Sequence, residues 1–405
     1  MVTSTELSDA WRRGRLGVRH RLTPSGRTDD IREVASSVVA LHSTDPVSVY
    51  LSAMARMRTP SLDAVRQALY RDRSVVRHHA MRRTLWVGTP EAVGVMHHAC
   101  TLKVASLERR RTEQFLAQNG IEDAARWLEE AKRRVTALVG DQGPLTARQI
   151  GLALPDLARP LAVASGKSYA ATQGAHSRVV AGLGFDGVLV RTQPLGGWTG
   201  GQYAWMTLEH WSPALHAAVN DPDADIESAQ RELARRWLAR FGPGTTRDLS
   251  WYAGWTLTET RRALAALEAV SVPTRHGTAW LLPEEVDSLG EDVHVGAARE
   301  PWVALLPSLD PTVMGWKDRD FYLSAGGEAA WDRNGNAGPT VWVDGAVVGA
   351  WAQRRDGEIV VHYFQEVPAR RRAEVRERAD EVAEWLADAR ISWRFPGAVN
   401  ADLLR

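Results

Sequence analysis

The chain has 405 residues, of which 44% are hydrophobic and 24% charged, the proportions of a folded globular protein. At this length we expect about two to four domains. No run of about 18 apolar residues is present, which argues against a membrane span. The single cysteine, Cys100, excludes an internal disulfide and a cysteine-cluster metal site, and the polar N-terminus favours a cytoplasmic protein.

Charge is balanced overall but uneven along the chain. Fifty basic and 49 acidic residues give a net charge of +1. Residues 56–111 hold twelve Lys or Arg and four acids, whereas residues 284–300 hold six acids and one arginine. The asymmetry suggests one face built for an anion. Ordinary solvated helix faces would give the same pattern, and for the basic block both interpretations stay open.

The first region is mainly helical. Residues 5–20, 29–41 and 61–72 have apolar side chains at helical spacing, and Ser61 is the expected N-cap of the last helix. The stretch His-Ser-Thr-Asp-Pro, residues 42–46, interrupts two apolar segments. Residues 73–92 contain β-branched runs about a basic centre and predict a short strand pair or wing. We predict a first module over 1–120.

Two further regions share one order of elements. Helices over 143–154, with Thr146 as N-cap, and 168–185, ended by Gly182 or Gly184, precede a glycine-rich hairpin over 187–211. The next region repeats this order. Helices are predicted over 228–242, 245–255 and 256–270, followed by a hairpin at His276-Gly277. This order is typical of winged helix-turn-helix modules, here 121–222 and 223–298.

The last region, 299–405, changes to β structure. Apolar and polar residues alternate, and Asp344-Gly345 and Asp356-Gly357 predict tight turns of a β-meander. Residues 368–389 form a charged amphipathic helix that would pack against it. The predicted fold class is therefore α+β, mainly α with short β-hairpins, with tandem winged helix-turn-helix modules and a C-terminal β-rich subdomain.

Several motifs together resemble a known family. These are "LHSTDPVSVYLSAMARM", "MRRTLWVGTPE", "GGWTGGQYAWMTLEHW", "LPSLDPTVMGW" and "PTVWVDGAVVGAWAQRR". They are similar to bacterial winged-helix DNA glycosylases of the AlkZ/YcaQ type, which excise alkylated purines, bulky adducts and crosslinks. The resemblance runs over nearly the whole chain. It implies tandem winged helices in a C-shape around damaged double-stranded DNA, no cofactor, and a role in DNA repair or antibiotic resistance near the nucleoid.

The chain departs from the family at its catalytic motif. Characterised relatives carry Gln-x-Gln or Gln-x-Asp where this chain has His42-Ser43-Thr44, while Asp45-Pro46 is retained. The resemblance places His42 and Thr44 on the catalytic pair. A neutral imidazole can orient water or accept its proton, Thr44 can supply a second contact, and Asp45 can stabilise a cationic sugar or fix the His42 tautomer.

The same segment also fits a structural role. Asp-Pro after Ser-Thr is an ordinary turn, and a histidine at a helix end often satisfies free carbonyl groups. For Asp45 alone we favour capping of the following helix.

Candidate DNA contacts come from arginines and one tryptophan. Arginines bind phosphates and supply affinity without reading sequence. The candidates are Arg12, Arg15 and Arg19 on one helix face, Arg77, Arg82 and Arg83 in the basic centre, and Trp198 at the glycine-rich tip. Trp198 is either a stacking wedge or a packing residue of its own module. The paired histidines at 78–79 and 97–98 lack a matched carboxylate, so we expect no metal site.

Two functions follow as hypotheses. The first is a monofunctional DNA glycosylase for alkylated or bulky-adducted purines in duplex DNA. The second is a non-catalytic winged-helix DNA-binding protein, either a regulator or a damage sensor. With no coiled coil or evident dimer helix, we expect a monomer. Sequestration of a small DNA-reactive compound is a third possibility.

Overall fold

In the computed structural model, which describes residues 6–163, 171–286, 289 and 300–404, one order of elements occurs three times. A helix is followed by a two-residue strand, two helices and an antiparallel hairpin. In each copy the two-residue strand pairs with the second strand of the hairpin, giving the sheets β1-β3-β2, β4-β8-β7 and β10-β11-β9. The α+β class is confirmed, and the order appears in the first region as clearly as in the other two.

The first repeat lies within the N-terminal helical region. Its elements are α1 Asp9–Arg19, η1 Pro24–Gly26, α2 Ile31–Ser36, β1 Leu41–His42, α3 Pro46–Met54, α4 Leu62–Tyr70, β2 Val76–His79, η2 Met81–Arg83, β3 Leu85–Gly88, α5 Pro90–Met96, the π-helical η3 His97–Thr101 and α6 Leu102–Gln118. Ser61 caps α4 as predicted. The helix predicted over 29–41 was too long. It ends at Ser36, because Leu41 and His42 pair with Val87 and Trp86 of β3.

The second repeat includes an additional hairpin. Its elements are α7 Ala124–Gln142, β4 Leu145–Thr146, α8 Ala147–Ala153, η4 Pro155–Ala158, β5 Pro160–Val163, β6 Ala171–Gly174, α9 Ala175–Phe185, β7 Leu189–Pro194, β8 Tyr203–Thr207, α10 Leu208–Trp211 and α11 Pro213–Val219. Thr146 caps α8 as predicted. The helix predicted over 168–185 begins only at Ala175, because the residues before it pair with β5. The first three predicted positions lie outside the described residues.

The third repeat and the C-terminal sheet follow. The repeat comprises α12 Ile226–Phe241, β9 Gly244–Thr245, α13 Thr246–Ala253, α14 Leu257–Ala266, β10 Val270–Thr274, β11 Gly277–Leu281 and α15 Pro283–Val286. The sheet region comprises β12 Val303–Leu306, η6 Gly327–Ala330, β13 Thr340–Val343, β14 Ala346–Gln353, β15 Ile359–Tyr363, α16 Ala369–Leu386 and α17 Ala398–Asp402. Most of the acidic stretch 284–300 lies outside the described residues.

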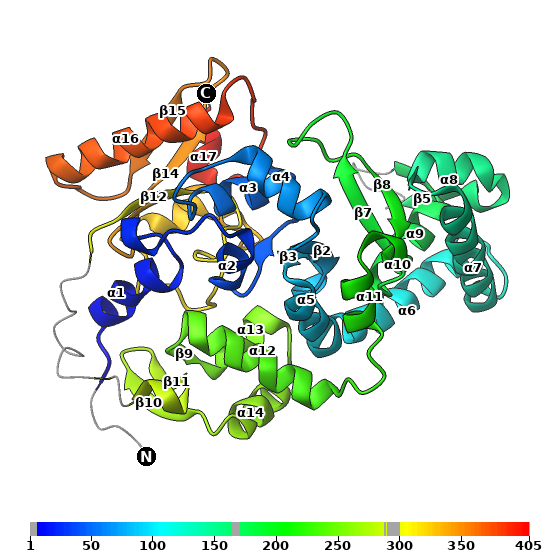
Figure 1. The fold of residues 1–405 in the computed structure, drawn as a ribbon, viewed down its shortest axis with the longest axis horizontal. Coiled ribbons are helices and arrows are strands. Elements are labelled where there is room, and N and C mark those ends of the chain that lie inside the picture. Colours follow the sequence, from blue (N-terminus) through cyan, green and yellow to red (C-terminus); the bar gives the residue numbers. More distant parts are fainter. Residues whose placement is uncertain (1–5, 164–170, 287–288, 290–299, 405) are drawn as a thin grey trace.

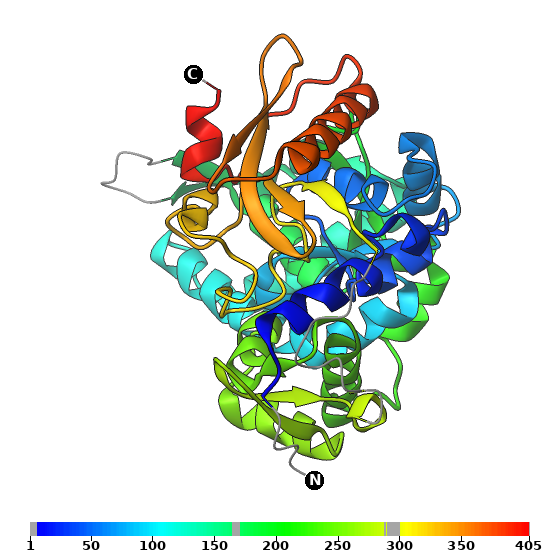
Figure 2. The same ribbon diagram turned by 90° about the vertical axis from the view of Figure 1, so that its left-hand side faces the viewer.

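The predicted meander is present in the C-terminal region. Its strands follow one another in the order β12-β13-β14-β15, with turns at Asp344-Gly345 and Asp356-Gly357. Helix α16 packs its apolar face, including Val375 and Val382, against this sheet (Figures 1 and 2). The sheet lies beside α3 of the first repeat, whereas the third repeat lies at the opposite end of the view in Figure 1.

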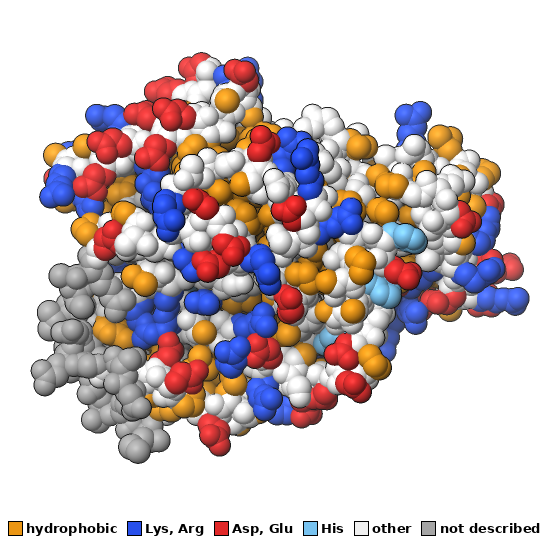
Figure 3. Space-filling view, in the orientation of Figure 1, with side chains coloured by type: hydrophobic (Ala, Val, Ile, Leu, Met, Phe, Trp, Pro, Cys, Tyr) orange, Lys and Arg blue, Asp and Glu red, His pale blue; other side chains and the backbone are white. Residues whose placement is uncertain are grey.

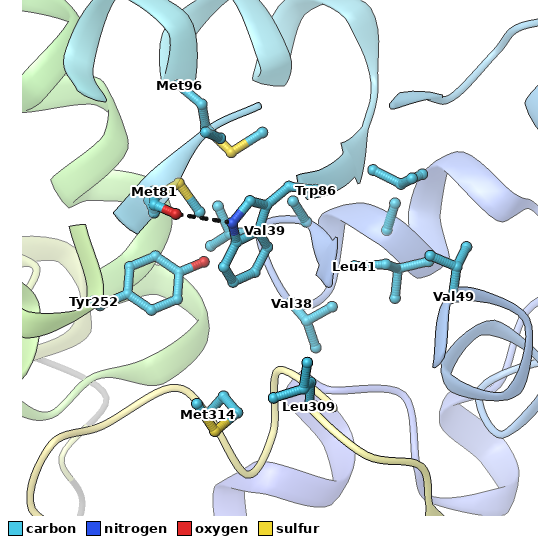
Figure 4. Packing of buried hydrophobic residues seen from close by; sticks show 14 of the residues in the cluster. Val38, Val39, Leu41, Val49, Met81, Trp86, Met96, Tyr252, Leu309 and Met314 are labelled. Carbon is cyan, nitrogen blue, oxygen red and sulfur yellow. Dashed lines mark hydrogen bonds between the residues drawn. The ribbon is translucent and has the colours of Figure 1, made fainter. Parts of the chain in front are cut away.

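One apolar core joins the first repeat, the third repeat and the segment after β12, while α7 and α9 of the second repeat bury a separate cluster. Figure 4 shows Trp86 of β3 between Tyr252 of α13 and Val38 near β1, with Leu309 below. Trp86 is fully buried and its indole N–H donates to Thr84 Oγ1 at 2.8 Å. The strand that carries the His-Ser-Thr segment is therefore held by a rigid, packed support.

A fully buried ion pair fixes the other side of α3. Arg56 donates to both carboxylate oxygens of Asp310, at 2.8 and 2.9 Å, and neither side chain is exposed. Ser52 Oγ also donates to Asp310, and Arg56 donates to Thr312 Oγ1. Burial alone would raise the pKa of Asp310, but the charge and hydrogen bonds of Arg56 outweigh it and the pKa is lowered. The motifs around 52–56 and 310–312 thus meet in one network.

Candidate active site

The turn between β1 and α3 is held by the Asp45 carboxylate. Asp45 Oδ1 accepts the backbone N–H of Val47 at 3.2 Å, which caps α3 as expected. Its Oδ2 accepts the backbone N–H of Arg394 at 3.0 Å, and the side chain is only 1% exposed. Burial raises the pKa of Asp45, although the amide hydrogen bonds oppose it. Both carboxylate oxygens of Asp45 therefore accept hydrogen bonds from backbone amides.

His42 lies beneath the turn, not on its surface. The side chain is 3% exposed, and its ring stands edge-on to Trp86 with 4.7 Å between centroids. Its Nδ1 accepts the backbone N–H of Thr44 at 3.4 Å. Burial, followed by the charge of Arg82, lowers the His42 pKa to about 3, so the imidazole is neutral at physiological pH. This position suits holding Thr44 better than accepting a proton from water near neutral pH.

Thr44 is partly exposed and lines a small pocket. Its Oγ1 accepts the backbone N–H of Leu85 at 3.2 Å, which leaves the hydroxyl hydrogen and one further lone pair for another partner. The free space is about 10 Å³, roughly the room that one water molecule needs. The polar side chains that line it are Ser43, Thr44, Arg77, Arg191, Tyr203 and Arg394.

Three arginines reach this pocket from three parts of the fold. Arg77 of β2 donates from Nε to Ser43 Oγ at 2.7 Å and from Nη2 to Tyr70 at 3.1 Å. Arg191 of β7 lies over the Tyr203 ring at 4.3 Å. Arg394, from the segment between α16 and α17, donates to the Thr44 carbonyl at 3.4 Å.

The remaining predicted arginines have internal roles. Arg12 is 4% exposed, donates to the Pro243 carbonyl at 3.2 Å and lies over the Phe321 ring. Arg15 and Arg19 both pair with Glu285, at the edge of the third repeat. The shared helix face that the sequence indicated does exist, but it packs inside the protein. These contacts within the protein argue against the predicted role of the three side chains as phosphate contacts.

Arg82 and Arg83 occupy the β2–β3 connection. Both have positive φ, 54° and 65°, which is costly for residues other than glycine. Arg82 lies over the Trp251 ring at 3.9 Å, and burial lowers its pKa to about 10, so it remains cationic. Arg83 is exposed and pairs with Glu108 at 2.8 Å. The structure brings neither residue into the pocket beside Thr44.

Trp198 is at the tip of the β7–β8 hairpin. Its ring stands edge-on to Tyr50 of α3, with 5.3 Å between centroids, and it is partly buried. It packs on the first repeat, which neither sequence interpretation anticipated. The hairpin tip therefore closes over the start of α3.

A larger groove borders the small pocket and shares Pro194 and Tyr203 with it. The groove has a volume of about 1240 Å³ and runs between the hairpin and the start of α8. Its lining includes the aromatic side chains of Tyr70, Trp205 and Trp211. On the face drawn in Figure 3, basic and acidic side chains are interspersed, so no single basic patch marks a DNA path there.

Sequence reasoning missed Arg191 and Arg394. Arg191 interrupts an apolar strand, which is a weak local signal of a functional charge, and nothing near Arg394 suggested a site. Within the described part of the chain, no group of three or more His, Cys, Asp or Glu is placed to bind a metal ion. His78 and His97 form only a pair, with 2.9 Å between ring nitrogens. No described helix is long and apolar enough to span a membrane.

Comparison with known proteins gives two matches. Residues 35–385 match the family model described as DNA glycosylase AlkZ-like. No curated protein matches the chain. Among solved structures, the Streptomyces sahachiroi DNA glycosylase AlkZ is similar, with a TM-score of 0.71 and 19% identity, over 96% of this chain and 100% of that one. That likeness shows the fold alone. Because the family model spans most of the sequence, the chain belongs to the AlkZ-like DNA glycosylase family.

Proposed function

We propose that this DNA glycosylase hydrolyses the N-glycosidic bond of alkylated or bulky-adducted purines in duplex DNA, without forming a covalent enzyme intermediate. The family match over residues 35–385 is the observation that carries the proposal. The large groove that shares Pro194 and Tyr203 with the Thr44 pocket supports the choice of bulky adducts, since its volume exceeds that of most small-molecule sites.

Release of an alkylated base needs little help from a general acid. Base loss passes through a sugar cation, and an N7-alkylated purine already carries positive charge, so it leaves without protonation. What remains is to hold a water molecule against the sugar. Thr44 Oγ1 is anchored by the Leu85 amide and keeps one lone pair for that water. His42 acts through Thr44, because its neutral Nδ1 holds the Thr44 amide. Asp45 fixes the turn.

The test measures base release and binding separately. A duplex with one N7-methylguanine is incubated with excess protein, and alkali-labile abasic sites are quantified on a gel. We expect Thr44→Val to slow release about 100-fold, because it removes the water contact but keeps the shape. Thr44→Ser is the matched control and should remain close to wild type. DNA affinity, measured by fluorescence anisotropy, should be unchanged in both.

The non-catalytic alternative has one observation in its favour. His42 and Asp45 are enclosed, at 3% and 1% exposure, and present little surface to a substrate. If wild-type protein binds duplexes with N7-methylguanine and bulky purine adducts but produces no abasic sites, the glycosylase proposal is wrong and a damage sensor remains.

A further inference from the structure

The pocket beside Thr44 has an unusual charge balance. Of the described residues that line it, three are arginines and none is acidic. Burial, followed by the nearby charges of Arg77 and Arg394 and opposed by Tyr203, lowers the pKa of Arg191 to about 10, so Arg191 remains cationic at neutral pH. The Asp45 carboxylate accepts the backbone amide of Arg394 and also interacts electrostatically with its side chain.

Buried charges in proteins are normally paired, because desolvation without a partner is costly. No described carboxylate lines the pocket beside Arg77 and Arg191, whereas the charge of the exposed Arg394 acts on Asp45. Arg77 has only the hydroxyl groups of Ser43 and Tyr70, and Arg191 has only aromatic faces. The cluster therefore has positive charge that no described acidic side chain of the pocket lining neutralises, and it is suited to bind an anion.

The shape of the pocket selects the kind of anion. Its free space admits about one oxygen atom, and the exposed side chain of Arg394 marks where it opens to solvent. A phosphate group would insert one oxygen and leave the rest outside, so the water held by Thr44 would lie at the mouth of the pocket. A purine base is far larger than this free space. The pocket therefore suits the backbone of the DNA strand and not the damaged base.

The hairpin is built to let Arg394 approach. A Cβ atom at Gly201 would overlap Nη2 of Arg394, so any other residue there would displace the guanidinium. Gly200, the adjacent residue, lines the pocket itself and presents backbone without a side chain. A polymer backbone can approach such a rim closely.

We infer that Arg77, Arg191 and Arg394 bind a non-bridging oxygen of one DNA phosphate, the phosphate adjacent to the nucleotide whose sugar faces Thr44. The inference rests on the proposed function, since that function puts the sugar at Thr44. It adds a contact that holds the damaged strand: the phosphate binds the three arginines while the neighbouring sugar faces the Thr44 hydroxyl.

The experiment pairs an arginine substitution with a neutral phosphate. Duplexes contain one N7-methylguanine on a 2′-fluoro sugar that resists base loss, which fixes the binding register. A single methylphosphonate linkage is moved one position at a time around this nucleotide, and dissociation constants are measured by anisotropy. We expect one position to weaken wild-type binding about tenfold or more, as loss of a charge-assisted contact does. Arg191→Gln should lose a similar factor on the duplex without a methylphosphonate and lose nothing further at that one position.

Two variants keep the result interpretable. Arg133→Gln is the control: it changes an exposed arginine that pairs with Glu130 on α7. Any loss of DNA affinity that it causes should be the same at every methylphosphonate position. Gly201→Ala should reproduce Arg191→Gln by displacing Arg394, without removing a charge. Thermal unfolding confirms that each variant is folded before its affinity is interpreted.

The outcomes separate this inference from the proposed function. If Arg191→Gln loses the same factor at every methylphosphonate position, the arginines contact no single phosphate and the inference is wrong, whatever the base-release assay shows. Because binding is measured on a duplex from which no base is released, the position-specific result can stand even if the protein excises no lesion. A protein that excises bases but shows no such position would keep the proposed function and lose the inference.

Discussion

Arginine side chains cluster in two neighbouring regions with opposite arrangements. Beside α3, Arg56 meets the Asp310 carboxylate face to face, and Ser52 and Thr312 complete the network. Across the turn at Thr44, three arginines share a pocket whose described lining contains no acid. In the first arrangement the arginine is neutralised by a carboxylate, whereas no described acidic side chain lines the second pocket. The first region maintains the fold, and the second is the one for which we propose a ligand.

The largest effect should come from breaking the complete pair. Asp310→Asn leaves Arg56 buried without a counter-charge, and we expect the free energy of unfolding to fall by about 3–5 kcal/mol. Urea denaturation measures this loss, provided that the free energy of unfolding falls with urea concentration at the same slope in both proteins. The double variant Arg56→Met with Asp310→Leu should recover part of the loss, since no lone charge remains. A loss below about 1 kcal/mol would show that the pair is not structural.

An intermediate effect on stability is expected when the pH is lowered. His42 and Asp310 should respond in different pH ranges. His42 has a folded pKa of about 3, below its ordinary 6.5, so its contribution to stability is complete above pH 6.5 and is lost as pH falls towards 3. The lowered pKa of Asp310 acts only below about pH 3.9, its ordinary unfolded value.

Between pH 6 and 4.5, His42→Gln should therefore reduce the pH slope of stability by up to about 1.4 kcal/mol per unit. Asp310→Asn should leave that slope unchanged. Other buried histidines, including His20 and His79, also have a pKa of about 3 and supply the remaining slope. Equal slopes in His42→Gln and wild type, from chemical denaturation at each pH, would contradict the assignment.

The smallest effect on stability should come from the incomplete cluster. Arg191→Met removes a buried charge that has no described carboxylate partner, so the lost contact with Tyr203 and the relieved desolvation nearly cancel, within about 1 kcal/mol. Its effect on DNA should be larger. The salt dependence of binding should lose about one unit of slope, as expected for one phosphate contact. A large loss of stability would mean that Arg191 belongs to the fold, like Arg56.

Much of the fold could be read from the sequence because its signals are local. Helix caps at Asp45, Ser61 and Thr146 occur where predicted, since a side chain bonds an amide two or three residues away. The meander follows from alternation and from its Asp-Gly turns. The two-residue strands gave no signal, because β1 exists only through its pairing with β3.

The candidate site was predicted only in part. The His-Ser-Thr segment was found through the resemblance, and Thr44 does reach a pocket. The arginines were misassigned, because helical spacing shows that Arg12, Arg15 and Arg19 share a face but not whether that face meets water or protein. Arg191 and Arg394 lie on separate elements far apart in the chain, so no local pattern relates them.

The sequence by itself determined the helices, the hairpins and the family, because these depend on short-range hydrogen bonding and on motifs that can be compared directly. Only the tertiary structure decided which charges are neutralised and which are not. Neutralisation depends on distances between residues hundreds of positions apart and on the water excluded around them, and folding alone sets both quantities.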